Sequence, residues 1–435
     1  MHPNPKPILP HPVPAPRPGV SARARFVRCA AWPVATLTLA VALRLAFVAW
    51  HGDVPLAGDP VTYDNIAQNL VNGHGYATGL GAADRHPTAM RGPTYVLLVA
   101  GVYALVGHRT MGVYLVQIAL DTVACWLVYR LGRHVFGRET VAVTAMLLYA
   151  LDPLFILNTG ALLTETFVTT LVLAASLGFL TWTRERRATS LVASSVAIGL
   201  LALSKPNLAP LPFVFFLSAP PTIPWGARVR ALALQVGVVA LLFAPWIARN
   251  AVVFHAFVPG VSIGGMTFWG GTGPDHGRTL GGPSDPGTPP HVRTAITGLS
   301  EVQRDRWFYG EGVRVIRSAP GRYLRLLAKK CVRLWFNLWF DDPPSRASIA
   351  LAVANLLAWL AAAVGMRASP ADRAASRLLL GLVGFFTVIH VVFFAVVRYA
   401  LPVYAYLLPF TASGLVAAAG AVRAPLAPAI RTGSR

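Results

Sequence analysis

The chain of 435 residues is 55% hydrophobic and only 13% charged, and its mean hydropathy is positive. Lys and Arg outnumber Asp and Glu by 38 to 17, but the basic residues lie mostly in short tracts between apolar runs. This distribution argues against nucleic acid as a partner and for the anionic head groups of membrane lipids. Apolar runs of about 18 residues or more recur, each about long enough to cross ~30 Å of hydrocarbon. The sequence therefore predicts an all-α polytopic membrane protein.

The first 28 residues are rich in Pro and Arg and predict a disordered cytoplasmic tail, and residues 423–435 are predicted to form the cytoplasmic tail at the other end. Residues 29–422 form one predicted membrane domain of about ten transmembrane helices. The first span, at 30–50, is interpreted as a signal anchor, because no clear cleavage site follows its long apolar region. The other spans are predicted near 111–130, 139–158, 162–182, 189–205, 207–219, 230–249, 347–366, 376–396 and 399–421.

The positive-inside bias places every basic tract and both termini in the cytoplasm if ten spans cross. This topology requires residues 92–107 not to cross. The segment has 16 residues, which is short for a span, and it predicts an interfacial or re-entrant helix. High usage of Ala, Arg, Val and Pro indicates a GC-rich bacterial genome, so the expected location is the bacterial cell (inner) membrane.

Two long segments, 51–110 and 250–345, then face the outside. The second contains "GGMTFWGGTGPDHGRTLGGPSDPGTPP", which is rich in Gly and Pro and predicts an irregular loop or lid. The stretch "RYLRLLAKKCVRLWF" follows it. Basic residues at helical spacing beside Leu and Trp predict an amphipathic helix on the outer membrane surface.

The first outer segment begins with "LAGDPVTYDNIAQNLVNGHG", residues 56–75. Asp59 suits the N-cap of a helix and Pro60 its first position. The same carboxylate can act as a general base on a hydroxyl at the membrane surface, and the two roles are compatible. Apolar residues repeat after it at the spacing of one helix face: Tyr63, Ile66, Ala67, Leu70 and Val71.

Ionisable residues recur at the outer ends of the predicted spans, where charges are rare and usually functional. Glu165 opens the span at 162–182, although the helix dipole alone favours an acid there. Snorkelling explains any one basic side chain at such an end. Several of them together with two acids instead favour a phosphate-bearing lipid head group. The other residues of this kind are Asp152, Lys205, Arg249 and Arg398.

Three further polar features have structural interpretations. Arg44 and Asp121 lie deeper in predicted spans and are expected to pair as structural charges. His390 is expected to be a hydrogen-bonded core histidine. The histidines have no metal-binding spacing, so neither a divalent metal nor another cofactor is expected.

Several short motifs occur in a recognisable order, and their order and placement are more specific than any one of them. They are Asp59 with Tyr63 and Ala67, "RGPTY" at 91–95, "GRHVFGR" at 132–138, "LLTETF" at 162–167, "APWIARNAVVFHAFVP" at 244–259 and "RYALP" at 398–402. This order resembles the C superfamily of membrane glycosyltransferases. Within it, the chain is most similar to the bacterial branch related to protein O-mannosyltransferases and lipid A aminoarabinose transferases.

The resemblance implies an inverting transfer of a hexosyl or pentosyl group from a polyprenyl-phosphate donor to a hydroxyl of a glycan, lipid or protein. The reaction would occur at the outer face of the cell membrane, in the synthesis of an envelope glycan. Asp59 would be the base that deprotonates the acceptor, and Glu165 would help to bind acceptor or donor. Pro60 stands where family members often carry a second acid. The expected substrate-binding residues are Tyr63, Arg91, Tyr95, Lys205, Arg249, Arg398 and Tyr399.

Two other functions remain open at this point. A transporter or flippase of a lipid-linked or anionic substrate would suit Lys205–Pro206 and the Arg44 and Asp121 charges. Such a protein is expected to place charges near the bilayer midplane, whereas most candidate charges here lie at outer span ends. A structural scaffold would explain the bundle but not the acids and bases. The pattern therefore favours an interfacial enzyme.

Overall fold

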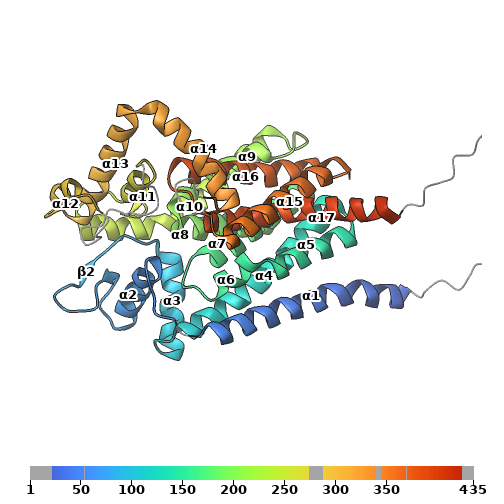
Figure 1. Cartoon of the computed structure of the whole chain (residues 1–435), viewed down its shortest axis with the longest axis horizontal. Helices are drawn as coiled ribbons and strands as arrows, with labels where there is room; N and C mark the ends of the chain where they lie inside the picture. Colours follow the sequence, from blue (N-terminus) through green and yellow to red (C-terminus); the bar gives the residue numbers. More distant parts are fainter. Residues whose placement is uncertain (1–21, 53, 274–287, 339–343, 369, 424–435) are drawn as a thin grey trace, which may run out of the picture.

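The computed structural model describes residues 22–52, 54–273, 288–338, 344–368 and 370–423, and it is almost entirely helical (Figure 1). The strands in this part of the chain are β1 (Ala77–Thr78) and β2 (His86–Pro87), which pair antiparallel. Most of both predicted tails lies outside the described residues. Helix α1 (Ala22–His51) begins within the first of them. The prediction of an all-α polytopic membrane protein is confirmed.

The expected count of about ten long spans is wrong. Among the described residues, seven helices are long and apolar enough to cross a membrane, or eight if one bent pair counts as a span. The bent pair is α5 (Glu139–Leu151) and α6 (Pro153–Thr159), which meet at 54°. The seven are α1, α4 (Thr110–Phe136), α7 (Glu165–Glu185), α10 (Trp225–Phe254), α15 (Arg346–Ala368), α16 (Arg373–Val392) and α17 (Leu401–Arg423) with η2 (Val397–Ala400) before it.

Prolines lie at the predicted spans that do not form long helices. The predicted spans at 189–205 and 207–219 correspond to α8 (Ala188–Ser204) and α9 (Leu211–Ser218), which have 17 and 8 residues. Between them lies η1 (Pro206–Leu208), because Pro206 has no N–H to continue the helix. Pro153 likewise ends α5, and the Asp152 side chain caps α6 by accepting from Leu154 N at 2.8 Å. The break at Pro153 separates α5 from α6, and the break at Pro206 follows the end of α8.

The segment expected not to cross forms α3 (Pro93–Val106), a helix of 14 residues. It packs against α2 (Asp59–Val71), whose Tyr63 ring meets the Tyr95 ring edge-on with 5.1 Å between centroids. The second long segment contains α11 (Gly264–Gly270), α12 (Pro290–Ile296), α13 (Glu301–Ser318) and α14 (Pro320–Phe336). The predicted amphipathic stretch is thus helical, while its contact with a membrane surface stays a prediction.

α17 lies at the centre of the bundle and is the most deeply buried span. It touches α15 backbone to backbone: a Cβ on Gly414 would come within 1.9 Å of the Ala361 carbonyl oxygen. Such close approach between small residues is how helices associate in lipid. Tyr406 fixes α17 to α7, because its hydroxyl lies 2.7 Å from both Ser176 Oγ and the Val172 carbonyl oxygen.

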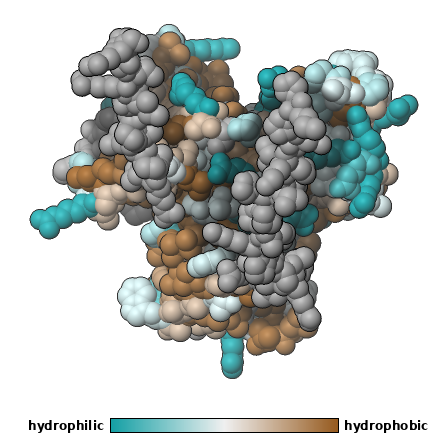
Figure 2. All heavy atoms as spheres, turned by 90° about the vertical axis from the view of Figure 1, so that its right-hand side faces the viewer, coloured by the Kyte–Doolittle hydropathy of each residue, from teal (hydrophilic) through white to brown (hydrophobic). Residues whose placement is uncertain are grey.

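The molecule has two different ends (Figure 1). Helices α2, α3 and α11–α13 gather at one end, and the first residues of α1 and the last of α17 lie at the other. Seen from that second end, the surface combines apolar areas with projecting hydrophilic side chains (Figure 2). The described ends of the chain thus lie on the same side, opposite the loop helices.

Candidate active site

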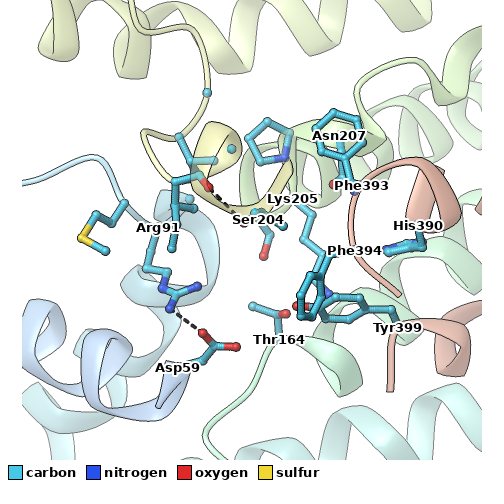
Figure 3. Close-up of a pocket in the computed structure, with 18 of the residues that line it drawn as sticks. Asp59, Arg91, Thr164, Ser204, Lys205, Asn207, His390, Phe393, Phe394 and Tyr399 are labelled. Atoms are coloured by element: carbon cyan, nitrogen blue, oxygen red, sulfur yellow. Dashed lines mark hydrogen bonds and ion pairs between the residues drawn. The ribbon is translucent and has the colours of Figure 1, made fainter. Parts of the chain in front are cut away.

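A cavity of about 460 Å³ lies between the bundle and the loop helices (Figure 3). Two glycines make its wall compact. A Cβ on Gly92 would lie 2.0 Å from the Leu203 carbonyl oxygen, and one on Gly260 would lie 2.7 Å from Pro206 Cβ. The backbone therefore packs directly against backbone and proline here. The wall is built from α2, α11, α13, the end of α16, η2 and the segments 90–92, 163–165, 204–207 and 259–261.

Asp59 is not the N-cap that the sequence predicts. Helix α2 begins at Asp59 itself, and the N-cap is Gly58, whose φ of 68° is a conformation that glycine adopts without strain. The Asp59 carboxylate is therefore free of the helix end. It accepts hydrogen bonds from Arg91 Nη2, at 2.7 Å, and from Arg398 Nη2.

The two guanidiniums determine the protonation of Asp59. Burial of the carboxylate raises its pKa, but the charges of Arg91 and Arg398 and their hydrogen bonds outweigh this and lower the pKa to about 2. The Asp59 side chain is 19% exposed, so water only partly screens its ion pairs with the two arginines. Asp59 is ionised in this arrangement and a weak base while both arginines hold it.

Glu165 is the second acid of the cavity and is the first residue of α7. Its side chain is 2% exposed, and Oε1 lies 3.4 Å from Lys205 Nζ and 3.7 Å from Arg398 Nε. Arg398 therefore lies between both acids. The Tyr399 ring supports these cations, with Lys205 Nζ at 4.7 Å and Arg398 Cζ at 5.2 Å from its centroid. Three cations thus face two carboxylates, which leaves one net positive charge.

Two polar atoms in the cavity wall are unsatisfied. Arg91 Nε and Ser204 Oγ are buried and have no hydrogen-bond partner among the residues that the structure describes. A buried donor without a partner costs ~1–3 kcal/mol, and both atoms could bind an acceptor oxygen of a ligand. The Arg91 guanidinium is held in place by the Tyr63 ring, with 4.9 Å from Cζ to the centroid. Burial raises the pKa of Tyr63 to about 12, so its hydroxyl stays protonated.

Seven of the nine sequence-predicted site residues meet in or beside this cavity, and the other two bind elsewhere. Arg249 donates to the carbonyl oxygens of Tyr76 and Thr88, each at 2.8 Å, and thereby fixes α10 to the hairpin segment. Tyr95 is fully buried, and its hydroxyl donates to Gln117 Oε1 at 2.6 Å. Both side chains support the neighbouring wall. The seven that meet are Asp59, Tyr63, Arg91, Glu165, Lys205, Arg398 and Tyr399.

Helix α13 supplies two wall residues that the sequence did not single out, Asp305 and Tyr309. Asp305 Oδ1 accepts from Gly265 N at 2.6 Å, and burial raises the pKa of this carboxyl. Glu301 anchors the helix: its buried carboxylate accepts from Thr88 Oγ1, Ala89 N and Ser262 Oγ. The only signal for this acid in the sequence is the Ser-x-x-Gln capping box that opens α13.

His390 is hydrogen-bonded inside the bundle, as predicted, but it also lines the cavity. The expected structural pair forms elsewhere: Arg44 and Asp121 are 0% and 1% exposed and lie 2.5 Å apart. Arg44 also donates to backbone carbonyl oxygens, and Asp121 accepts from Tyr149 at 2.7 Å. Within the described ranges, no group of three or more His, Cys, Asp or Glu residues is placed to hold a metal ion.

The chain was compared with known proteins. Residues 86–248, less than half of the chain, match the model of the dolichyl-phosphate-mannose-protein mannosyltransferase family. None of the curated proteins matches the chain. Three solved structures align with the chain at low sequence identity.

The archaeal oligosaccharyltransferase AglB from Archaeoglobus fulgidus, in complex with an inhibitory peptide and a dolichol-phosphate, has a TM-score of 0.54 and 14% identity over 88% of this chain. The match covers 50% of AglB, so the chain spans about half the length of that protein. ArnT from Cupriavidus metallidurans bound to undecaprenyl phosphate has a TM-score of 0.42 and 14% sequence identity, and the match covers 92% of this chain and 79% of ArnT. The S. cerevisiae protein O-mannosyltransferase Pmt1-Pmt2 complex bound to the sugar donor has a TM-score of 0.41 and 16% sequence identity. That match covers 55% of this chain and 36% of the other.

These matches agree with the resemblance expected from the motifs. The fold is shared with AglB over most of the chain, and residues 86–248, which include Arg91 and Glu165, resemble the O-mannosyltransferase family in sequence. The chain thus resembles the membrane glycosyltransferases of the C superfamily, in particular the O-mannosyltransferases.

Proposed function

We propose that the chain transfers a sugar from a polyprenyl-phosphate donor to a hydroxyl acceptor at the outer face of a bacterial cell membrane, with inversion at the anomeric carbon. The observation that carries this proposal is the charged network of the cavity. Asp59, Glu165, Arg91, Arg398 and Lys205 converge from five separate segments of the chain. Bulk stability does not require charges at this cost in a membrane protein.

The net charge of the network suits a lipid phosphodiester. Three cations against two carboxylates leave one positive charge, and a polyprenyl-phosphate sugar carries one negative charge on its phosphate. Arg91 Nε and Ser204 Oγ are donors that lack a partner among the described residues, and phosphate oxygens are acceptors. Guanidinium groups bind such oxygens in a fixed geometry.

Donor binding would also activate Asp59. The two arginines that bind phosphate oxygens best are those that hold the Asp59 carboxylate. When they turn toward the donor phosphate, the carboxylate loses the interactions that keep its pKa at about 2. Its basicity then increases at the time when an acceptor hydroxyl has to be deprotonated. Free enzyme and donor complex would thus differ in the strength of the base.

In the transfer step the acceptor oxygen attacks the anomeric carbon, and its proton passes to the Asp59 carboxylate. The bond between the anomeric carbon and the phosphate oxygen breaks, and its electron pair stays on the phosphate. Negative charge therefore grows on the leaving group, where Arg398 and Lys205 can stabilise it. Glu165 holds these two cations in place. The residues present supply the acid–base and electrostatic parts of the step.

The test combines lipid analysis with one substitution. We expect protein purified in lipid nanodiscs to carry a polyprenyl-phosphate sugar, identified by mass spectrometry of the extracted lipid. With that donor, Asp59→Asn should lose transfer by about 10²- to 10⁴-fold, the usual contribution of a general base. Asp84→Asn is the matched control, because Asp84 is exposed on the same segment and does not line the cavity. Transfer by Asp59→Asn at the parental rate would refute the assignment of the base.

The proposed outer face can be tested independently. Arg109 is exposed next to α3, at the end of the bundle where the cavity lies. Arg187 is exposed beyond the far end of α7. We expect Arg109→Cys, in whole cells, to react with a membrane-impermeant maleimide, and Arg187→Cys to react only after the cells are broken. The reverse pattern would place the cavity in the cytoplasm.

A further inference from the structure

His390 has a hydrogen-bonding atom that the proposed transfer does not use. The side chain is 5% exposed, lies near the end of α16 and lines the cavity. Its Nδ1 lies 2.8 Å from the Phe386 carbonyl oxygen, which can only accept, so Nδ1 carries a proton and donates. In the neutral ring this leaves Nε2 as an acceptor. No described residue donates to it.

The surroundings of His390 are largely aromatic. Its ring is stacked on Phe386 at 5.7 Å and lies 5.2 Å from the Tyr399 ring, centroid to centroid. Phe393 and Phe394 continue this wall of the cavity. Aromatic faces with a few fixed polar atoms are the usual composition of a site for a neutral, partly apolar ligand.

The position of this wall assigns it to one part of the substrate. Figure 3 shows Asp59 and Arg91 on one side of the cavity and His390, Phe394 and Tyr399 on the other. The acceptor hydroxyl that is deprotonated has to approach Asp59, on the opposite side of the cavity from His390. A phosphate oxygen is itself an acceptor and gains nothing from Nε2. What remains is a hydroxyl of the donor sugar.

We propose that His390 is a specificity-determining residue that accepts a hydrogen bond from a hydroxyl of the donor sugar, whose ring lies against Tyr399 and Phe394. This inference rests on the proposed function and names the subsite within it. Lys205 marks the border between the two parts of the donor, because its Nζ lies 4.7 Å above the ring of the same Tyr399. The sugar subsite thus adjoins the cations that would hold the phosphate.

The experiment compares two probes on the full chain in nanodiscs: undecaprenyl phosphate, which has no sugar, and a panel of undecaprenyl-phosphate hexoses and pentoses. His390→Phe preserves the aromatic packing but removes the acceptor. We expect it to weaken binding of the preferred sugar-bearing probe by about tenfold, the usual effect of one hydrogen bond, with an unchanged Kd for undecaprenyl phosphate. His390→Gln, which restores an acceptor, should recover most of the loss.

His74→Phe is the matched control, because His74 is exposed and lies outside the cavity. Donors lacking one sugar hydroxyl provide a second readout. The parent should lose about tenfold affinity for one of these deoxy donors, and His390→Phe should lose nothing further for that donor. A structural role for His390 would not produce this pattern.

Two results would overturn the inference: His390→Phe binding the sugar-bearing probe as the parent does, or equal losses for both probes. Failure of the proposed function looks different. In that case the parent would bind neither undecaprenyl phosphate nor any of its sugar derivatives.

Discussion

Two acid–base clusters lie in this largely apolar chain, and they differ in how completely they are satisfied. Arg44 and Asp121 form a one-to-one pair that excludes water, and the remaining hydrogen-bonding atoms bind backbone carbonyl oxygens and Tyr149. The cluster around Asp59 has three cations for two acids and borders a cavity. The first cluster needs no ligand, whereas the second has both a net charge and unused donors.

The difference teaches that charge in a membrane span does not by itself identify a site. Both clusters contain arginine and aspartate that are at least partly buried, and in the sequence only the deeper position of Arg44 and Asp121 distinguishes them. In the structure, the two clusters differ in how many of their polar atoms have a hydrogen-bond partner. Complete satisfaction indicates a structural role, and buried donors without a described partner, such as Arg91 Nε and Ser204 Oγ, indicate where a ligand binds. The predictions below test this separation.

The largest expected effect is on stability at the satisfied pair. Asp121→Asn leaves Arg44 buried without its counter-charge and should destabilise the chain by about 3–5 kcal/mol. Chemical unfolding in micelles measures this loss. The folded fraction should still bind undecaprenyl phosphate with the parental Kd, since neither residue lines the cavity. The double variant Arg44→Met/Asp121→Leu should recover most of the stability, and a loss of lipid binding in it would argue against a purely structural pair.

A smaller effect is expected on the acid side of the Asp59 cluster. The pKa of Asp59 is about 2 in the folded chain and 3.8 ordinarily, so ionised Asp59 stabilises the fold by about 2 kcal/mol at neutral pH. Because the folded pKa is the lower one, this contribution is complete above pH 3.8 and is lost as the pH falls through 2. Unfolding of parent and Asp59→Asn at pH 7, 4 and 3 should therefore give a difference that shrinks toward acid. A difference independent of pH would contradict the ion pairs.

The smallest effect distinguishes the two roles of the arginines. In Asp59→Asn, Arg91 and Arg398 no longer bind a carboxylate, so undecaprenyl phosphate should bind more tightly, by up to about tenfold. Isothermal titration in nanodiscs measures this change, with Asp84→Asn as the control. A weaker affinity in Asp59→Asn would mean that the carboxylate holds the arginines in the binding position and does not compete with the phosphate.

Much of the fold was predictable from the sequence because hydrophobic runs in lipid have few alternatives to helices. The limits of the spans depended on single residues. Pro153 breaks the predicted span at 139–158, and the two predicted spans on either side of Pro206 form helices too short to cross. Run length alone does not show how the chain continues after such a break. The start of α2 was misplaced by one residue, because Gly58 with its positive φ takes the N-cap position expected for Asp59.

The site was partly predictable for the same kind of reason. Motif order identified Asp59, Arg91, Glu165 and Arg398, which the fold brings together over a separation of 339 residues between Arg398 and Asp59. The contributions of Asp305 and His390 depend on tertiary contacts, such as those of Glu301 with the 88–89 and 262 positions. No local pattern encodes such contacts. Arg249 has the sequence environment of a phosphate-binding residue, yet its donors bind backbone carbonyl oxygens.

The excess of one positive charge in the cluster around Asp59 has a kinetic consequence under the proposed function. After transfer the lipid phosphate is a monoester that carries more negative charge than the donor did, while the cations around it are unchanged. The spent carrier would then be held more strongly than the incoming donor, so its departure would limit the turnover rate. Return of the carrier to the inner leaflet by a flippase would accelerate the enzyme. Sugar transfer would in this way respond to how quickly the cell recycles its lipid carrier.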